Sequence, residues 1–184
     1  NIMVSNEYWR KNISSFKALI DKWAYDMSDE SVQNLSIFLD AKCVAGDGSL
    51  LKDLRDYLNN NFHARDDVLA HVAKAILNFE TPLSIFSGFV IEKEHKNRLD
   101  LKKGGIFALV HGVRTLSLKH GIYATNTIER IKELNNIGII DKTFATELIE
   151  SFDTLSSIRL KAMLEEKNID ESNYINPKNL DKIQ

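Results

Sequence analysis

The sequence predicts an all-α protein, a helical bundle of about six or seven helices with short connections. Apolar residues recur at intervals of three and four along most of the 184-residue chain, which is the spacing of an amphipathic helix. The breaks between these runs are short and contain glycine, proline or asparagine. A hydrophobic content of 43% and a charged content of 27% are typical of a globular domain with a real core.

The first helix is predicted to start at Asn6, because an asparagine side chain can accept from the first free amides of a helix. A second run, "SVQNLSIFLDAKCV", starts at Asp29 or Ser31, and around Leu39 it also alternates like a strand; we favour a helix. The apolar stripe of the first helix consists of Trp9, Ile13, Phe16, Ile20, Trp23 and Met27.

The segment "AGDGS" then breaks the chain, and two further helical stripes follow. Pro82 ends the second of them, because proline cannot continue a helix and pushes Thr81 toward extended geometry. The first stripe contains Leu50, Leu51, Leu54, Tyr57, Leu58 and Phe62, and the second contains Val68, Leu69, Val72, Ile76 and Leu77.

The last third of the chain carries two further helix starts. In "TNTIER", Asn126 precedes Glu129 by three residues and forms a capping-box pattern, so a short helix begins there. "IGIID" turns the chain, and Asp141 caps a long last helix; Asn176 followed by Pro177 is one more start signal. The apolar residues of the long helix are Phe144, Leu148, Phe152, Leu155, Ile158, Leu160 and Leu164.

Composition excludes several classes of protein. A net charge of −2 argues against a general nucleic-acid binder, whose surface should be basic over a whole face. The single Cys43 allows no internal disulfide and no cysteine-only zinc site, which fits a reducing cytoplasm. No apolar run approaches the roughly 20 residues of a membrane span, and no signal-peptide pattern opens the chain. The start "NIMVSNEYWRKN" lacks an initiator methionine, and we interpret the chain as a piece of a longer protein.

Most candidate catalytic motifs have simpler interpretations. Asp53 and Asp56 in "GDGSLLKDLRD" lie three apart on a predicted helix, whereas paired metal carboxylates on a strand need alternate spacing. We favour a helix cap followed by a solvated face there. Cys43 is expected to pack rather than react, and no serine lies in a Gly-x-Ser-x-Gly elbow. No metal-ligand spacing includes the histidines His63, His71, His111 and His120.

A dense basic stretch is the remaining candidate site. It leads into a helix predicted to begin after Gly104 and Gly105 and to end at Gly121. Free amides at a helix start, together with lysines, can hold a phosphate, and the glycines would let it approach the backbone. Arg114 would add a planar, bidentate donor farther along; a solvated basic loop remains the alternative. The basic residues are Lys93, His95, Lys96, Arg98, Lys102 and Lys103.

Two blocks of this sequence resemble the putative nucleotidyltransferase substrate-binding domain. This helical region follows a nucleotidyltransferase-like domain in bacterial and archaeal signalling proteins that often carry CBS domains. The family pattern "ATNTxER" is matched by residues 124–130. The pattern "hKgxLDLKkxGl" is matched at His95, Lys96, Leu99, Asp100, Leu101, Lys102, Lys103 and Gly104. The resemblance implies that residues 1–45 end a nucleotidyltransferase-like domain and that residues 46–184 form the helical substrate-binding domain.

A more distant similarity involves "LDLKKGGIFALVHGVRTL". It is similar to the "VKxGxGGLRDIxxL" segment of the uridylyltransferase that modifies the nitrogen-signalling protein PII and to a segment of the adenylyltransferase of glutamine synthetase. Lys102 and the glycine pair carry the similarity. Phe107 and Ala108 replace the arginine and acidic residue of those enzymes, and His111 stands at the usual acidic position of the closer family.

The resemblance implies a division of labour. Upstream carboxylates would hold magnesium for attack on the α-phosphate of ATP or UTP, and this helical part, silent by itself, would close the cleft over nucleotide or substrate. Asp40 is the one candidate here for a carboxylate of the upstream domain, and a capping or salt-bridge role is favoured for it over an ion role. The implied binding residues are His95, Lys96, Asp100, Lys102, Lys103, Arg114, Thr125, Asn126 and Arg130.

Among these, Lys102 and Lys103 would contact phosphate, and Arg114 and Arg130 would line the same cleft. Thr125 and Asn126, with Glu129, are expected mainly to hold the second helix start in place. The acceptor, a protein or a small molecule, stays open, and we expect no nucleic acid or membrane as partner. The second hypothesis is a non-catalytic regulatory or docking domain that passes adenylate signals sensed by CBS domains to other proteins.

Overall fold

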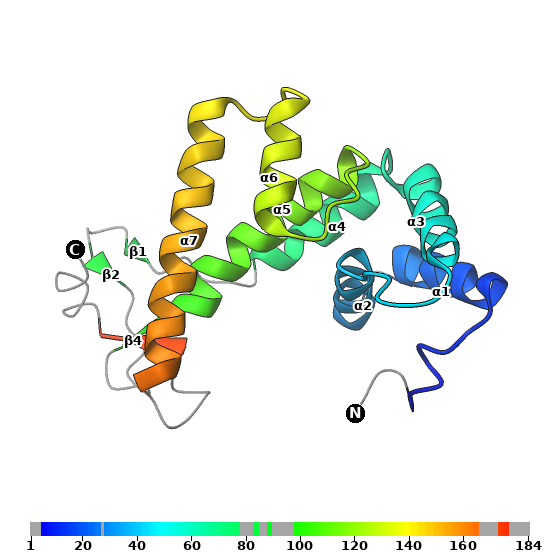
Figure 1. Cartoon of the computed structure of the whole chain (residues 1–184), viewed down its shortest axis with the longest axis horizontal. Helices are drawn as coiled ribbons and strands as arrows, with labels where there is room; N and C mark the ends of the chain where they lie inside the picture. The colour runs from blue at the N-terminus through cyan, green and yellow to red at the C-terminus, as the bar shows by residue number, and fades with distance from the viewer. Residues whose placement is uncertain are drawn as a thin grey trace.

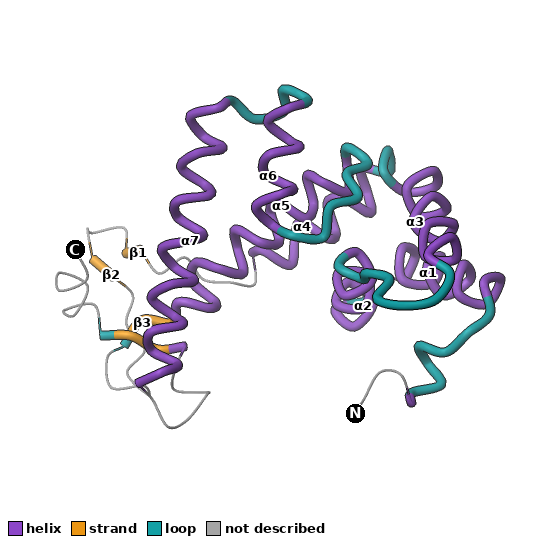
Figure 2. The backbone as a smooth tube through the Cα atoms, viewed as in Figure 1, coloured by secondary structure: helices purple, strands orange, loops and turns teal. Residues whose placement is uncertain are grey.

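The computed structural model describes residues 5–26, 28–77, 83–84, 88–89, 98–165 and 173–176. Over these ranges the protein is all-α, as predicted, with two short pairs of strands at one end (Figures 1 and 2). The helices are α1 (Ile13–Asp26), α2 (Asp29–Leu39), α3 (Gly48–Phe62), α4 (Asp66–Leu77), the π-helical turn η3 (Lys102–Phe107), α5 (Ala108–Lys119), α6 (Thr127–Asn136) and α7 (Lys142–Glu165).

The first hydrophobic core lies among α1, α2, α3 and α4, together with Leu118 of α5. Helices α1, α2 and α3 lie at one end of the molecule, and α4 runs beside α5 (Figure 1). Trp23 is the largest fully buried side chain of this core, and aromatic rings from α1 and α2 pack around it. Burial of such rings is a main source of folding free energy. The core consists of Leu19, Ile20, Trp23, Ala24, Leu35, Phe38, Leu54, Leu58, Phe62, Val68, Leu69, Val72 and Leu118.

The second core joins α5, α6 and the start of α7. It contains Val113, Ile131, Leu134, Ile140 and Ala145. Helices α6 and α7 stand side by side (Figure 1) and are joined by a turn at Gly138. Because α5 contributes Leu118 to the first core and Val113 to the second, it connects the two halves of the molecule.

The strands are short and antiparallel. In one pair, β1 (Leu83–Ser84) lies beside β2 (Gly88–Phe89). In the other, β3 (Leu99–Asp100) lies beside β4 (Tyr174–Ile175), with Asp100 opposite Tyr174. The second pair ties the segment just before η3 to a segment that follows α7.

Most predicted helix ends are confirmed. The ambiguous stretch is helical as far as Leu39 and continues as a loop from Asp40, and Ser28 caps the helix just before Asp29. Asp47 accepts from the amide of Ser49 at 2.9 Å, and Asp141 accepts from that of Phe144 at 2.9 Å. Gly121, with φ of +65°, ends α5 in the left-handed region that favours glycine. The predictions for Met27, Thr81, Pro82 and Pro177 lie outside the described residues.

The predicted start of the first helix is wrong. Asn6 accepts from the amide of Tyr8 at 2.9 Å and closes a turn, whereas Asn12 accepts from that of Ser15 at 2.8 Å and caps α1. Tertiary contacts favour the turn, because the Tyr8 hydroxyl accepts from Trp23 Nε1 at 2.8 Å. Trp9 still packs against the first core from this turn.

The predicted domain boundary between residues 45 and 46 falls in the loop before α3. Residues of α1 and α2 share a core with residues of α3 and α4 on the other side of this loop. The boundary stays a prediction, with the two segments packed against each other.

Candidate functional site

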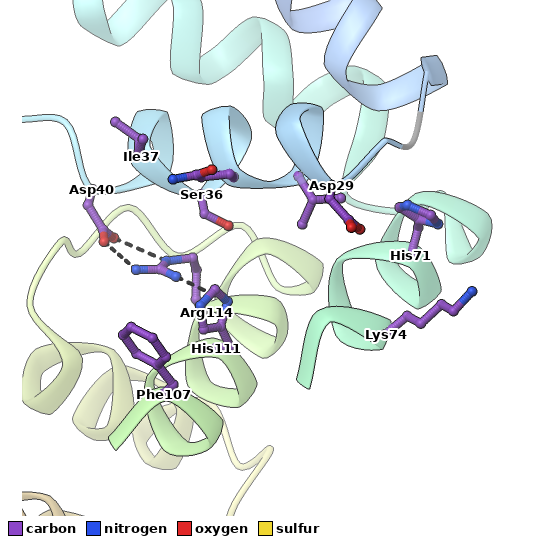
Figure 3. Close-up of a pocket in the computed structure, with 11 residues that line it drawn as sticks. Asp29, Ser36, Ile37, Asp40, His71, Lys74, Phe107, His111 and Arg114 are labelled. Atoms are coloured by element: carbon purple, nitrogen blue, oxygen red, sulfur yellow. Dashed lines mark hydrogen bonds and ion pairs between the residues drawn. The ribbon is translucent and has the colours of Figure 1, made fainter. Parts of the chain in front are cut away.

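A cavity of about 720 Å³ lies between α2, α4 and the η3–α5 helix (Figure 3). This volume is within the range of small-molecule binding sites, about 300 to 1,000 Å³. The lining combines apolar, cationic and acidic side chains: Asp29, Val32, Gln33, Ser36, Ile37, Asp40, His71, Lys74, Phe107, His111 and Arg114. Its chemistry therefore suits a ligand with both an apolar part and an anionic group.

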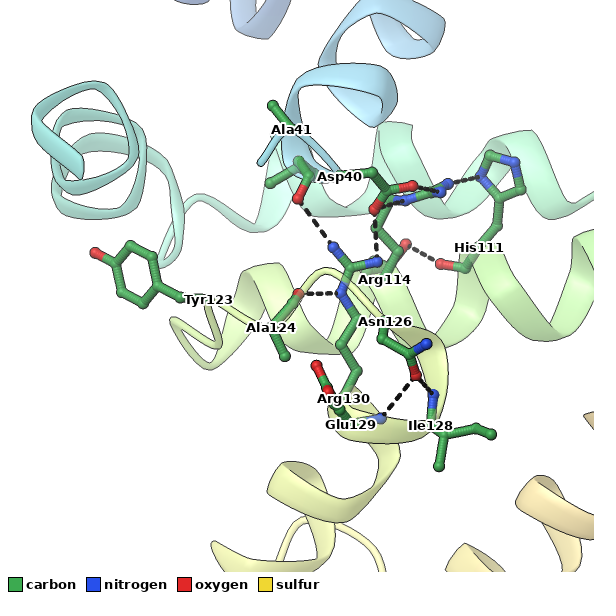
Figure 4. Close-up of polar contacts among 12 residues, drawn as sticks. Asp40, Ala41, His111, Arg114, Tyr123, Ala124, Asn126, Ile128, Glu129 and Arg130 are labelled. Atoms are coloured by element: carbon green, nitrogen blue, oxygen red, sulfur yellow. Dashed lines mark hydrogen bonds and ion pairs between the residues drawn. The ribbon is translucent and has the colours of Figure 1, made fainter. Parts of the chain in front are cut away.

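Arg114 forms the polar end of this cavity, where α2 ends. Its side chain is almost buried, and its guanidinium donates to both carboxylate oxygens of Asp40, with Nε 3.4 Å from Oδ1. Arg130 Nη1 lies 2.7 Å from the same Oδ1. We call Asp40, Arg114 and Arg130 the Asp40 cluster (Figure 4). One carboxylate thus accepts from two arginines, as the predicted salt-bridge role for Asp40 requires.

Backbone carbonyls hold the arginines of this region in place. Arg130 donates through Nε to Ala124 O at 2.7 Å and through Nη2 to Leu39 O at 3.0 Å. Arg55 also donates to Leu39 O and to Ala41 O. These contacts satisfy carbonyls at the end of α2, where the helix dipole favours positive charge. Burial lowers the pKa of Arg130 and of Arg55, and the nearby Asp40 carboxylate opposes this.

His111 lies one helical turn before Arg114. Arg114 Nη1 lies 3.4 Å from His111 Nδ1, and since arginine has only donors, Nδ1 accepts in this contact. Burial lowers the pKa of His111, and the positive charge of Arg114 lowers it further. Both effects favour the neutral ring, which lies edge-on to the Phe107 ring at a centroid distance of 6.0 Å.

Ser36 lies on α2 and faces the cavity (Figure 3). Its side chain is 6% exposed, and its Oγ has no hydrogen-bond partner in the described part of the chain. Because a buried hydroxyl is usually hydrogen-bonded, this atom marks a polar position in the cavity wall.

The basic stretch has a different geometry from the predicted one. The helical segment begins before the glycines: Asp100 is buried and its Oδ1 accepts from the amide of Lys103 at 2.9 Å. Gly104 and Gly105 therefore lie inside η3 rather than ahead of a helix. A Cβ at Gly105 would lie 3.0 Å from Leu155 Cδ1, so this glycine allows close packing against α7.

The two lysines of this stretch differ in their contacts. Lys102 Nζ lies 5.1 Å from the centroid of the Phe107 ring, which is part of the cavity wall. Lys103 Nζ lies 3.9 Å from Asp100 Oδ2 and is largely exposed. Lys102 is not part of the cavity lining, but its ammonium lies beside a ring of the cavity wall. Lys103 lies at the cap of its own helix.

The other predicted residues are distributed as follows. Arg130 belongs to the Asp40 cluster and is not part of the cavity lining. Asn126 caps α6, with Oδ1 2.9 Å from the amide of Ile128, as expected for a helix start. Thr125 lies in the loop before it and, like Asn126, is not part of the cavity lining. His95 and Lys96 lie outside the described residues.

Sequence reasoning missed the α2 and α4 walls of the cavity. Ser36, His71 and Lys74 lie on the polar sides of helical stripes, and nothing in the local pattern distinguishes them from surface residues. The spacing of Phe107 and His111, four apart on one helix, places both on one face. That signal was available, although it does not indicate a cavity by itself.

The described residues do not fit a magnesium site. They contain no group of three or more His, Cys, Asp or Glu side chains arranged for a metal ion. Asp40 is bound by two arginines, so its oxygens are not suited to a hard cation. Asp53 is exposed, in agreement with the predicted solvated face. Asp56 is half-buried; it pairs with Lys52 at 2.6 Å and accepts from the Tyr123 hydroxyl at 2.7 Å. None of the helices in the described ranges is long and apolar enough to cross a membrane.

Comparison with known families gives one result. The model of the family described as putative nucleotidyltransferase substrate binding domain matches residues 66–184. The match begins with the first residue of α4, so α4 and α5 supply two cavity walls from inside the matched region, and α2 supplies the third from outside it. No curated protein and no solved structure matches the chain.

Proposed function

The chain belongs to the putative nucleotidyltransferase substrate binding domain family, and we propose that it binds nucleotide or substrate for a nucleotidyltransferase without being catalytic itself. The binding site in this proposal is the cavity between α2, α4 and α5. The Lys102 ammonium lies beside its wall. The parent protein would be a cytoplasmic signalling protein of bacterial type, with CBS domains next to the nucleotidyltransferase.

The observation that carries this proposal is the composition of the cavity lining. Phe107, with Val32 and Ile37, offers an apolar surface for a base or another flat group. Arg114 supplies a planar donor, and Lys74 supplies a second cation. A nucleoside triphosphate has both kinds of group.

The catalytic step belongs to another part of the protein in this proposal. Magnesium, with ATP or UTP, would be held by carboxylates of an upstream nucleotidyltransferase domain, because the carboxylates described here do not fit it. The helical domain would orient the bound molecule, which lowers the entropic barrier to transfer. The acceptor would be a protein or a small molecule.

Calorimetric titration of the chain with magnesium-ATP and magnesium-UTP, at low and moderate salt, tests the proposal. We expect salt-sensitive binding that Lys102→Ala weakens about fivefold, because its ammonium lies beside the cavity wall and is partly solvated. Lys103→Ala should weaken it less, since that ammonium lies near Asp100. Lys132→Ala, an exposed lysine of α6 outside the cavity lining, is the control.

Absence of binding at millimolar concentrations of both nucleotides would contradict a nucleotide site in this chain. Equal affinities of the wild type and Lys102→Ala would contradict the placement of the phosphates near Lys102. Thermal unfolding of each variant checks that the fold is kept.

A docking role is the second candidate, because apolar side chains are exposed at the turn between α6 and α7. Ile137, Ile139 and Phe144 are 53%, 40% and 47% exposed there. An exposed apolar group at the tip of a helix pair is typical of an interaction surface. This second function would be favoured if neither nucleotide binds and if Phe144→Ser abolishes the association of the chain with a partner protein.

A further inference from the structure

The polar end of the cavity contains the parts of an anion site already occupied by the protein's own carboxylate. Arg114 and His111 lie on α5 and Ser36 lies opposite on α2 (Figure 3). The Asp40 carboxylate lies on the guanidinium of Arg114. An arginine that is only 8% exposed needs an anionic partner, and here that partner comes from the end of α2.

Asp40 is less dependent on this contact than Arg114 is. The Asp40 side chain is 37% exposed, so solvent reaches part of it. Its Oδ1 also accepts from Arg130 at 2.7 Å. A carboxylate that left Arg114 would therefore keep one arginine and its contact with solvent, whereas the buried Arg114 would need another anion in its place.

The unpartnered hydroxyl of Ser36 is an independent sign that this end receives a polar group. It is 6% exposed, it lines the same cavity as Arg114, and the protein groups in the described ranges leave its Oγ without a hydrogen bond. A hydroxyl can donate to a phosphate oxygen. Because Nδ1 of His111 accepts from Arg114, the ring proton lies on Nε2, and that nitrogen can only donate.

We propose that Asp40 is an internal competitor in this site, and that a phosphate group of the ligand replaces the Asp40 carboxylate on Arg114, with Ser36 as a further contact. This regulation rests on the proposed function, since it concerns the same cavity. The exchange removes the contact between Arg114 on α5, inside the matched family region, and Asp40 at the end of α2, outside it. Arg130 keeps its own contact with Asp40 and with Leu39 O. Occupancy of the cavity would thus loosen α2 from α5 without detaching it.

The test uses inorganic pyrophosphate as the probe, titrated by calorimetry into the chain without magnesium. Asp40→Asn should bind pyrophosphate about tenfold more tightly than the wild type, because the competing charge is removed from Arg114. Asp29→Asn is the matched control: it removes the same charge from the lining of the same cavity but not from Arg114. We expect the control to change the affinity much less.

Equal or weaker binding by Asp40→Asn than by Asp29→Asn would overturn the proposal. Because Asp40→Asn also weakens the contacts of Arg130, it can fail to fold, and Ser36→Ala then decides. This substitution removes a hydroxyl without a protein partner, so the fold should be kept and the affinity for pyrophosphate should fall about threefold. If Ser36→Ala bound pyrophosphate as tightly as the wild type, the proposed phosphate contact of Ser36 at the polar end of the cavity would be contradicted.

The outcomes separate this inference from the proposed function. Tighter pyrophosphate binding by Asp40→Asn, with no binding of magnesium-ATP or magnesium-UTP to the wild type, would keep the competitor role and reject the nucleotide. Nucleotide binding by the wild type, with the same pyrophosphate affinity in Asp40→Asn and Asp29→Asn, would keep the proposed function and reject the competitor role.

Discussion

The two groups of cations predicted to bind nucleotide or substrate differ in what surrounds them. Arg114 and Arg130 are buried and share Asp40, and Arg130 also donates to two backbone carbonyls. Lys102 and Lys103 lie at the start of η3, where the free amide expected to bind a ligand is capped by Asp100. The arginines therefore have a structural role that a ligand must compete with, whereas the lysines keep partly solvated ammonium groups.

This difference shows why a cationic motif does not by itself indicate a ligand. In "ATNTIER", the arginine joins the α5–α6 loop to the end of α2 through Ala124 O and Leu39 O. In "LDLKKGG", the aspartate caps the helix that carries the lysines. Both blocks that carry the family resemblance thus contain residues needed for the fold.

The largest expected effect is the loss of Arg130. Arg130→Ala should lower the free energy of unfolding by about 3 kcal/mol, because a buried ion pair is broken and two carbonyls lose their donor. Lys132→Ala, on the exposed side of the same helix, should change it by less than about 0.5 kcal/mol. Urea unfolding of both variants measures this. A loss below about 1 kcal/mol for Arg130→Ala would contradict the structural role of the arginine.

An intermediate effect is expected at Asp100. Asp100→Ala should lower the free energy of unfolding by about 1 kcal/mol, since the amide of Lys103 loses its cap. Asp100→Asn keeps an acceptor oxygen and should recover most of this loss. Urea unfolding of the wild type and of both Asp100 variants measures these changes in the free energy of unfolding. If Asp100 served only as a ligand contact, Asp100→Ala would be as stable as the wild type.

The smallest expected effect is a pH dependence due to His111. Its pKa in the folded chain lies below the ordinary 6.5 because of burial and Arg114. Below pH 6.5 the unfolded chain therefore binds more protons at this residue than the folded chain, and stability falls as the pH decreases toward the lowered pKa. His111→Gln should remove this contribution. Unfolding curves at several pH values between 7.5 and 5 measure it, and parallel pH profiles for the two proteins would contradict it.

The helices could be predicted from the sequence because each carries an apolar stripe and a local cap. Asn126, Asp141 and Gly121 are examples in which the cap and the turn are within a few residues of each other. The start of α1 could not be predicted, because Asn6 and Asn12 are both good caps and contacts of Tyr8 with Trp23 favour the turn at Asn6.

The candidate site was predicted only in part. Arg114 and Lys102 were identified from charge and from the family resemblance; Arg114 lines the cavity, and the Lys102 ammonium lies 5.1 Å from the centroid of the Phe107 ring in its wall. The cavity itself depends on α2 lying across α4 and α5, and the partnership of Asp40 with Arg114 joins residues 74 positions apart. Sequence patterns within one helix or turn cannot predict a contact between residues so far apart in the chain. The glycine pair was misread because its close neighbour, Leu155, lies on another helix.

Filling the cavity between α2, α4 and α5 tests most directly whether a ligand binds there. Ile37 lines the cavity and is not part of either core, so Ile37→Trp should fill the space and keep every charge. Magnesium-ATP and magnesium-UTP would be titrated into the wild type and this variant, with thermal unfolding as the check on folding. We expect the wild type to bind at least one nucleotide and the folded Ile37→Trp variant to lose at least tenfold in affinity. Undiminished binding by a folded Ile37→Trp variant would contradict the account.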